Sequence, residues 1–147
     1  MPIANVEGLK NTRILLVDDY ADALEMWALY LRFCGYEVIT AADGLAAVTT
    51  ARDEMPDLII LDLDLPGITG VEAARRLKDQ AETQHIPLVA ATGYSHLTQI
   101  NEARLAGFDA VLIKPCEPDV LVREIEKILV GARPDFVPPT KTIAQSG

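Results

Sequence analysis

Polar side chains that suit phosphoryl chemistry stand at the ends of four short apolar runs. They are Asp18 and Asp19, Asp62, Thr92 and Lys114, each directly after its run. If the runs are parallel strands, their carboxyl ends line one crevice, so these side chains should converge there. Three carboxylates, one hydroxyl and one ammonium group form a coherent set for handling a phosphoryl group beside Mg²⁺, which prefers oxygen ligands.

These residue types have distinct tasks in such a site. Three crowded carboxylates repel one another unless a cation offsets their charge, so Mg²⁺ belongs in the predicted site. An ionised carboxylate can attack phosphorus and form an acyl phosphate, and we assign this role to Asp62. Lys114 would neutralise phosphoryl oxygens, and the Thr92 hydroxyl would donate a hydrogen bond to one of them.

Each of these residues also has a purely structural interpretation. An aspartate after a strand is ordinarily a turn former or the N-cap of the next helix. Lys114 before Pro115 fits a solvated lysine, and Thr92 before Gly93 fits a turn. Their joint occurrence at the same end of four predicted strands favours a functional site over separate structural roles.

The elements that must position these residues follow from the hydrophobic pattern. Continuous apolar runs indicate strands covered on both faces, and apolar residues at helical spacing indicate the helices between them. This alternation is typical of an α/β fold with a parallel sheet. The predicted strands are residues 14–17, 36–41, 58–61, 88–91 and 110–113, and the predicted helices are residues 20–34, 44–54, 71–80, 97–106 and 117–130.

Length and composition limit the remaining classes of protein. The chain of 147 residues fits one domain, and its net charge of -9 disfavours binding to nucleic acid. No apolar run is long enough to cross a membrane, and two cysteines fit a reducing compartment, so we expect a cytoplasmic protein. We expect an N-terminal extension over residues 1–12, a folded domain over 13–130, and a flexible tail or linker over 131–147, where proline and small polar residues replace the pattern.

The site motifs together resemble the receiver domain of two-component response regulators. The resemblance covers residues 13–130 and is carried by ILLVDD (14–19), LIILDLDLPGITG (58–70), Thr92-Gly93 and Lys114-Pro115. It implies a flavodoxin-like (βα)5 fold with a five-stranded parallel sheet of order 2-1-3-4-5 and helices on both faces. It also implies a signalling domain, not a conventional enzyme, that takes a phosphoryl group from a histidine kinase or a histidine phosphotransfer protein.

The resemblance also assigns further site residues. It implies that Asp62 is the phosphoacceptor and that Mg²⁺ is held by Asp19, Asp62 and the backbone carbonyl of Asp64, with Asp18 acting through water. The Lys114–Pro115 peptide bond is expected to be cis, a state that is essentially confined to proline. A conformational switch would follow phosphorylation, and the family allows a homodimer through the last two helices and the fifth strand.

Three positions depart from the usual family pattern. Val111 stands where the family often has an aromatic residue that moves on activation. We therefore assign the predicted switch to Thr92, with Val111 at the position of the usual aromatic residue. Asp64 and Tyr94 border the path of the hydrolytic water in the family, so the lifetime of the phosphoryl group cannot be transferred from relatives.

Other interpretations remain at this point. Asp62-Leu63-Asp64 resembles the motif of haloacid-dehalogenase-type phosphatases, but Pro66 occupies a position that is usually Thr or Val in that family, and the acidic pair precedes the motif instead of following it. A nucleotide-binding domain is disfavoured, because no glycine-rich phosphate-binding motif follows any predicted strand. The chain could act alone, through an unidentified downstream protein, or be the receiver module of a larger hybrid histidine kinase.

Overall fold

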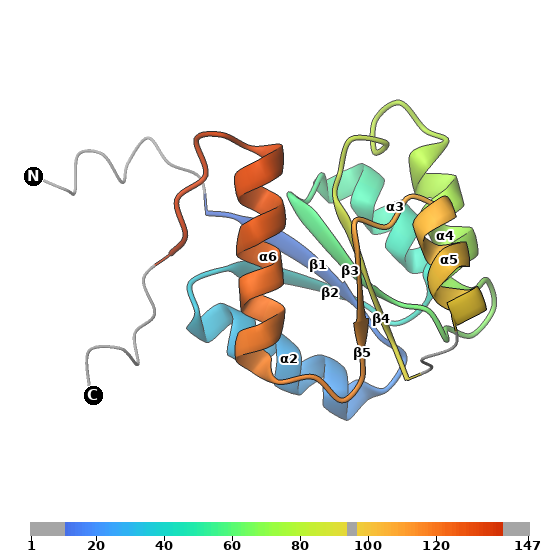
Figure 1. Ribbon diagram of the computed structural model, residues 1–147, viewed down its shortest axis with the longest axis horizontal. Helices are drawn as coiled ribbons and strands as arrows, with labels where there is room; N and C mark the ends of the chain where they lie inside the picture. The colour runs from blue at the N-terminus through green and yellow to red at the C-terminus, as the bar shows by residue number, and fades with distance from the viewer. Residues whose placement is uncertain (1–10, 94–96, 140–147) are drawn as a thin grey trace, which may run out of the picture.

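The computed structural model describes residues 11–93 and 97–139, and over these ranges strands and helices alternate along the chain (Figure 1). Among the helices it describes, none combines the length and apolar character that a membrane crossing requires. The strands are β1 (Arg13–Val17), β2 (Glu37–Ala41), β3 (Leu58–Asp62), β4 (Leu88–Thr92) and β5 (Ala110–Ile113), and the helices are α2 (Ala21–Phe33), α3 (Gly44–Glu54), α4 (Gly70–Lys78), α5 (Leu97–Leu105) and α6 (Pro118–Ala132).

The five strands form one parallel sheet in the order β2-β1-β3-β4-β5, as predicted. In this order β1 and β3 are neighbours, and Val17 pairs with Leu61. The residues that follow this pair, Asp18 and Asp62, therefore emerge side by side at the carboxyl edge. The register of the sheet thus brings together carboxylates that are far apart in the sequence.

Helices cover both faces of the sheet and create two cores (Figure 1). Successive residues of β1 point into different cores. Leu15 faces the core under α3, α4 and α5, whereas Leu16 faces the core under α2 and α6. Because the inner strands β1, β3 and β4 bury both faces, their sequences are nearly continuous apolar runs, whereas the edge strands β2 and β5 are partly exposed. Burial of each large aliphatic side chain contributes about 1.5–3 kcal/mol, and this anchors the strand ends that carry the site.

Short local signals set the helix boundaries. The side chain of Asp43 accepts a hydrogen bond from the Ala46 backbone N–H at 2.7 Å and caps α3. Thr69 caps α4 in the same way, through the Glu72 N–H at 3.1 Å. Gly35 follows α2 with φ +103°, a left-handed conformation that favours glycine.

The C-terminal boundary differs from the prediction. Helix α6 continues to Ala132, and the described part of the expected tail, residues 133–139, packs against the domain. Phe136 is only 9% exposed and belongs to the core between α2 and α6. A single aromatic side chain without periodicity thus fills a space that only the packed helices create. Residues 1–10 and 140–147, which hold most of the predicted extension and the end of the tail, lie outside the described residues.

Candidate functional site

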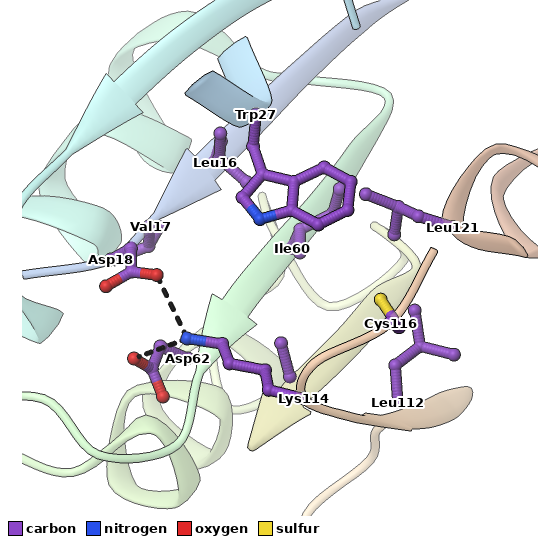
Figure 2. A pocket seen from close by; sticks show the side chains of 11 residues that line it. Leu16, Val17, Asp18, Trp27, Ile60, Asp62, Leu112, Lys114, Cys116 and Leu121 are labelled. Atoms are coloured by element: carbon purple, nitrogen blue, oxygen red, sulfur yellow. Dashed lines mark hydrogen bonds and ion pairs between the residues drawn. The ribbon is translucent and has the colours of Figure 1, made fainter. Parts of the chain in front are cut away.

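Three of the predicted site residues meet through one ammonium group. Asp18 follows β1, Asp62 ends β3 and Lys114 follows β5. The Lys114 Nζ lies 3.0 Å from Asp18 Oδ2 and 3.2 Å from Asp62 Oδ2, and Figure 2 shows the lysine side chain reaching both carboxylates. The fold therefore converts three positions that are distant in sequence into one charged cluster.

Backbone hydrogen bonds fix the orientation of both buried carboxylates. The Tyr20 N–H donates to Asp18 Oδ1 at 2.9 Å, and the Asp64 N–H donates to Asp62 Oδ1 at 3.0 Å. In each carboxylate, the second oxygen accepts from Lys114. These backbone amides orient the two carboxylates without adding a formal charge. The residue types alone did not predict these hydrogen bonds.

Asp19 completes an acidic cluster with Asp18 and Asp62. Each of the three offers a carboxylate oxygen, and these oxygens lie within 4.8 Å of one another. Asp19 is exposed, whereas Asp18 and Asp62 are 6% and 7% exposed. A set of close carboxylates that opens toward solvent on one side matches the oxygen donors that a hard divalent cation prefers.

Burial and charge shift the pKa of the two groups at the centre. Burial raises the pKa of Asp62 above its ordinary value, and the nearby Asp18 carboxylate adds to this effect, although the Asp64 N–H and Lys114 oppose it. For Lys114, burial alone would lower the pKa, but the contacts with Asp18 and Asp62 outweigh it and raise the pKa. Lys114 thus remains a cation at neutral pH, and Asp62 is a more basic carboxylate than an exposed aspartate.

Thr92 lies at the same edge of the sheet, beside Lys114. It ends β4, is fully buried, and pairs in register with Ile113. The Lys114 backbone N–H donates to the Thr92 carbonyl at 2.7 Å, so the two residues are direct neighbours across β4 and β5. The Lys114–Pro115 peptide bond is cis.

The remaining predicted site positions differ in their surroundings. The side chain of Asp64 is exposed next to Asp62. Val111 is partly buried and packs against the core under α3, α4 and α5. Tyr94 lies outside the described residues.

Gly70, the last residue of the motif over residues 58–70, shapes the loop that follows Asp62. Its N–H donates to the Leu63 carbonyl at 3.0 Å. A β-carbon at this position would overlap the Asp62 carbonyl oxygen and lie 2.7 Å from the Leu63 Cα. The start of α4 is therefore packed directly on the backbone of the site, and glycine permits this approach.

A small cavity adjoins the charged cluster on the side of α2 and α6. Its walls include Trp27, Cys116 and Leu121, and Figure 2 shows these side chains around the stem of Lys114. The cavity volume is about 30 Å³, which suits a water molecule and not an organic ligand. No sequence motif marks Trp27 as a neighbour of the site, because the position of α2 in the fold brings it there.

Comparisons with known proteins agree with this geometry. The family model for the response regulator receiver domain matches residues 14–126. The polar-differentiation response regulator DivK of Brucella anthropi is 31% identical over 119 residues, which cover 81% of this chain and 97% of that protein. This match, which spans nearly the whole domain, sets aside the haloacid-dehalogenase alternative.

Solved structures give the same result. The CheY-like receiver domain protein of Methanospirillum hungatei has a TM-score of 0.81 and 28% identity, with 86% of this chain and all of that chain covered (100%). The receiver domain of sensor histidine kinase PA1611 from Pseudomonas aeruginosa, with a magnesium ion in its active-site cleft, has a TM-score of 0.75 and 30% identity over 80% of this chain and 97% of that one. On the evidence of its fold, its acidic site and these matches, the chain belongs to the response regulator receiver domain family.

Proposed function

We propose that this receiver domain takes a phosphoryl group onto Asp62 from a phosphohistidine and changes its surface in response. The observation that carries the proposal is the contact of Lys114 with both Asp18 and Asp62 at 3.0 and 3.2 Å. This arrangement presents a buried, oriented carboxylate beside a cation that can accept phosphoryl oxygens. As a receiver domain the chain has a histidine kinase as its partner, and we extend the proposal to histidine phosphotransfer proteins as donors.

The transfer step uses few groups of the protein. An Asp62 carboxylate oxygen attacks phosphorus, the bond from phosphorus to the donor imidazole nitrogen breaks, and the imidazole leaves as an acyl phosphate forms. Lys114 neutralises negative charge on the phosphoryl oxygens, and the Thr92 hydroxyl donates to one of them. The amide of Asp64 keeps the attacking carboxylate aligned through its hydrogen bond of 3.0 Å.

The donor set fits Mg²⁺ as the cofactor of this reaction. Asp18, Asp19 and Asp62 would hold the ion with their carboxylates, with Asp18 acting through water, and the backbone carbonyl of Asp64 would add a ligand. When bound, the ion supplies positive charge that offsets the carboxylates and the phosphoryl oxygens. The magnesium ion in the PA1611 receiver supports this assignment.

We assign the output to a conformational switch at Thr92 and Val111. A movement of the Thr92 loop toward the phosphoryl group would alter the face formed by α5, β5 and α6, which are the elements next to Lys114 in the chain. This face is also where we place a homodimer contact or a downstream protein. The net charge of -9 supports a protein target over nucleic acid.

We propose a receiver unit that begins at Arg13, after an extension of residues 1–12, and ends with α6 at Ala132, just beyond the expected residue 130. Both cysteines, Cys34 and Cys116, are free thiols, which supports a reducing compartment such as the cytoplasm. The unit could work alone or within a larger hybrid kinase.

A phosphorylation experiment tests the assignment of Asp62. The protein is incubated with phosphoramidate and Mg²⁺, and intact-mass spectrometry measures phosphoryl incorporation. Wild type and the matched control Asp64→Asn should be labelled, whereas Asp62→Asn should not. Addition of excess chelator should stop labelling of the wild type, because an anionic donor would then face three carboxylates whose charge is offset only by Lys114. Labelling of Asp62→Asn at the wild-type level, or labelling unaffected by chelator, contradicts the proposal.

A further inference from the structure

The segment that follows α6 folds back across the domain. It begins at Arg133, and Pro139 contacts Gly35, which follows α2. Figure 1 shows the segment leaving the end of α6 and running toward the end of α2. A β-carbon at Gly35 would lie 2.6 Å from the Pro139 Cβ, so the Pro139 ring packs directly against Gly35. We call residues 133–139 the C-terminal strap. It connects the C-terminal ends of the two helices that cover one face of the sheet.

An aromatic anchor and an ion pair hold the strap. The Phe136 side chain is 9% exposed within the core that contains Cys34 and Leu129. The Arg133 Nη1 lies 3.0 Å from Asp57 Oδ1, and Asp57 is itself fixed at the start of β3, where its other oxygen accepts the Arg13 N–H at 2.8 Å. The strap thus closes the end of the core between α2 and α6.

The attachment of the strap is weaker than the packing beneath it. The side chains of Arg133 and Asp57 are 36% and 31% exposed, and an ion pair with this exposure contributes little. Val137, next to the anchor, is 73% exposed. A segment held mainly by one side chain at the edge of a core can open locally while the rest of the domain stays folded.

We propose that the C-terminal strap is a latch, docked in the resting protein and able to open without unfolding of the domain. Its opening uncovers the core at Cys34, which precedes Gly35 and is 1% exposed when the latch is closed. The latch joins α2 and α6, whose Trp27 and Leu121 line the cavity beside Lys114. It therefore connects the chain after Pro139 to the two helices that flank the phosphorylation site.

Thiol labelling of the full chain measures the opening of the latch. Iodoacetamide alkylates free thiols with loss of iodide, and peptide mass spectrometry resolves Cys34 from Cys116. Phe136→Ala removes the anchor and should raise the labelling rate of Cys34 about 10- to 100-fold, the factor expected for loss of one buried aromatic contact. The labelling rate of Cys116, which is partly exposed beside the site, should change little. The neighbouring change Val137→Ala is the matched control and should leave both rates unchanged.

The dependence of labelling on urea separates the latch from global unfolding. Opening of a short segment exposes little surface, so the Cys34 rate of the wild type should be nearly independent of urea at low concentration. If the labelling rate of Cys34 instead rises with urea from the lowest concentrations as steeply as global unfolding does, the strap does not open separately. The proposal would also be overturned if Phe136→Ala changed the labelling rates of both cysteines equally. The same holds if Cys34 in Phe136→Ala were labelled at the wild-type rate.

Discussion

Replacement of Asp62, the proposed phosphoacceptor, should make the protein more stable while it abolishes phosphorylation. Burial raises the pKa of Asp62, which means that ionisation of this carboxyl group is less favourable in the folded than in the unfolded chain. Asp62→Asn removes that charge, keeps the shape of the side chain, and retains an oxygen that can accept the Asp64 N–H. Lys114 does not become an isolated buried charge, because it keeps its ion pair with Asp18 at 3.0 Å.

Two opposing contributions determine the size of this effect. Each unit of pKa increase on folding costs about 1.4 kcal/mol of stability at pH values above both pKa values. Burial raises the pKa of Asp62, and Lys114, whose side chain is 33% exposed, lowers it, so the net pKa increase already includes the contact with Lys114. We therefore expect a net increase on the order of 1 kcal/mol in the free energy of unfolding at pH 7, or a rise of the urea midpoint by about 0.5 M.

The stability difference between Asp62→Asn and the wild type should depend on pH. A carboxyl group whose pKa is higher in the folded than in the unfolded chain stabilises the folded state fully at pH values below its unfolded-state pKa of 3.8. This stabilisation is lost as the pH rises through the folded-state pKa. The advantage of Asp62→Asn should thus be largest at neutral pH and shrink as pH falls toward 3.8.

Urea titrations in chelator, followed by the fluorescence of the single tryptophan, Trp27, measure this difference between pH 7.5 and 4.5. Asp64→Asn makes the same change in net charge at an exposed position and serves as the control. A variant that is less stable than the wild type at pH 7, or a gain that does not change with pH, would refute the reasoning.

Three further predictions follow from other contacts. Gly70→Ala should lower the free energy of unfolding by about 2 kcal/mol or more, because the new methyl group meets the backbone at the end of β3. Gly131→Ala, with open space around it in α6, should instead raise the free energy of unfolding by up to about 1 kcal/mol in the same urea titration, because alanine is the better helix former. Tyr36→Phe should stabilise the protein by up to about 1 kcal/mol, since the buried Tyr36 hydroxyl has no hydrogen-bond partner among the described residues; a loss of stability would show that it has one. Thr92→Ala should weaken the response to beryllofluoride, measured by hydrogen exchange over α5, β5 and α6, more than Val111→Ala does, and the opposite order would place the switch at Val111.

The sequence by itself determined the fold and the residue types of the site. Strands buried on both faces require continuous apolar runs, and such runs are visible without any structure. The predicted ranges for α3 and β5 agree with the structure at both ends, and the other elements differ by one or two residues. Because parallel strands place their carboxyl ends at one edge, the approach of Asp18, Asp62 and Lys114 could also be predicted.

Only the tertiary structure decided which atoms are in contact and what lies around them. Lys114 contacts Asp18 across 96 positions of the sequence, and the amide donors to both carboxylates depend on how the loops turn after β1 and β3. The contact of Pro139 with Gly35 likewise depends on the positions of two helices that no local pattern relates. Local spacing encodes the faces of helices and strands, but contacts between elements arise from packing of the whole chain, and for this reason the cavity and the C-terminal strap could not be predicted from the sequence.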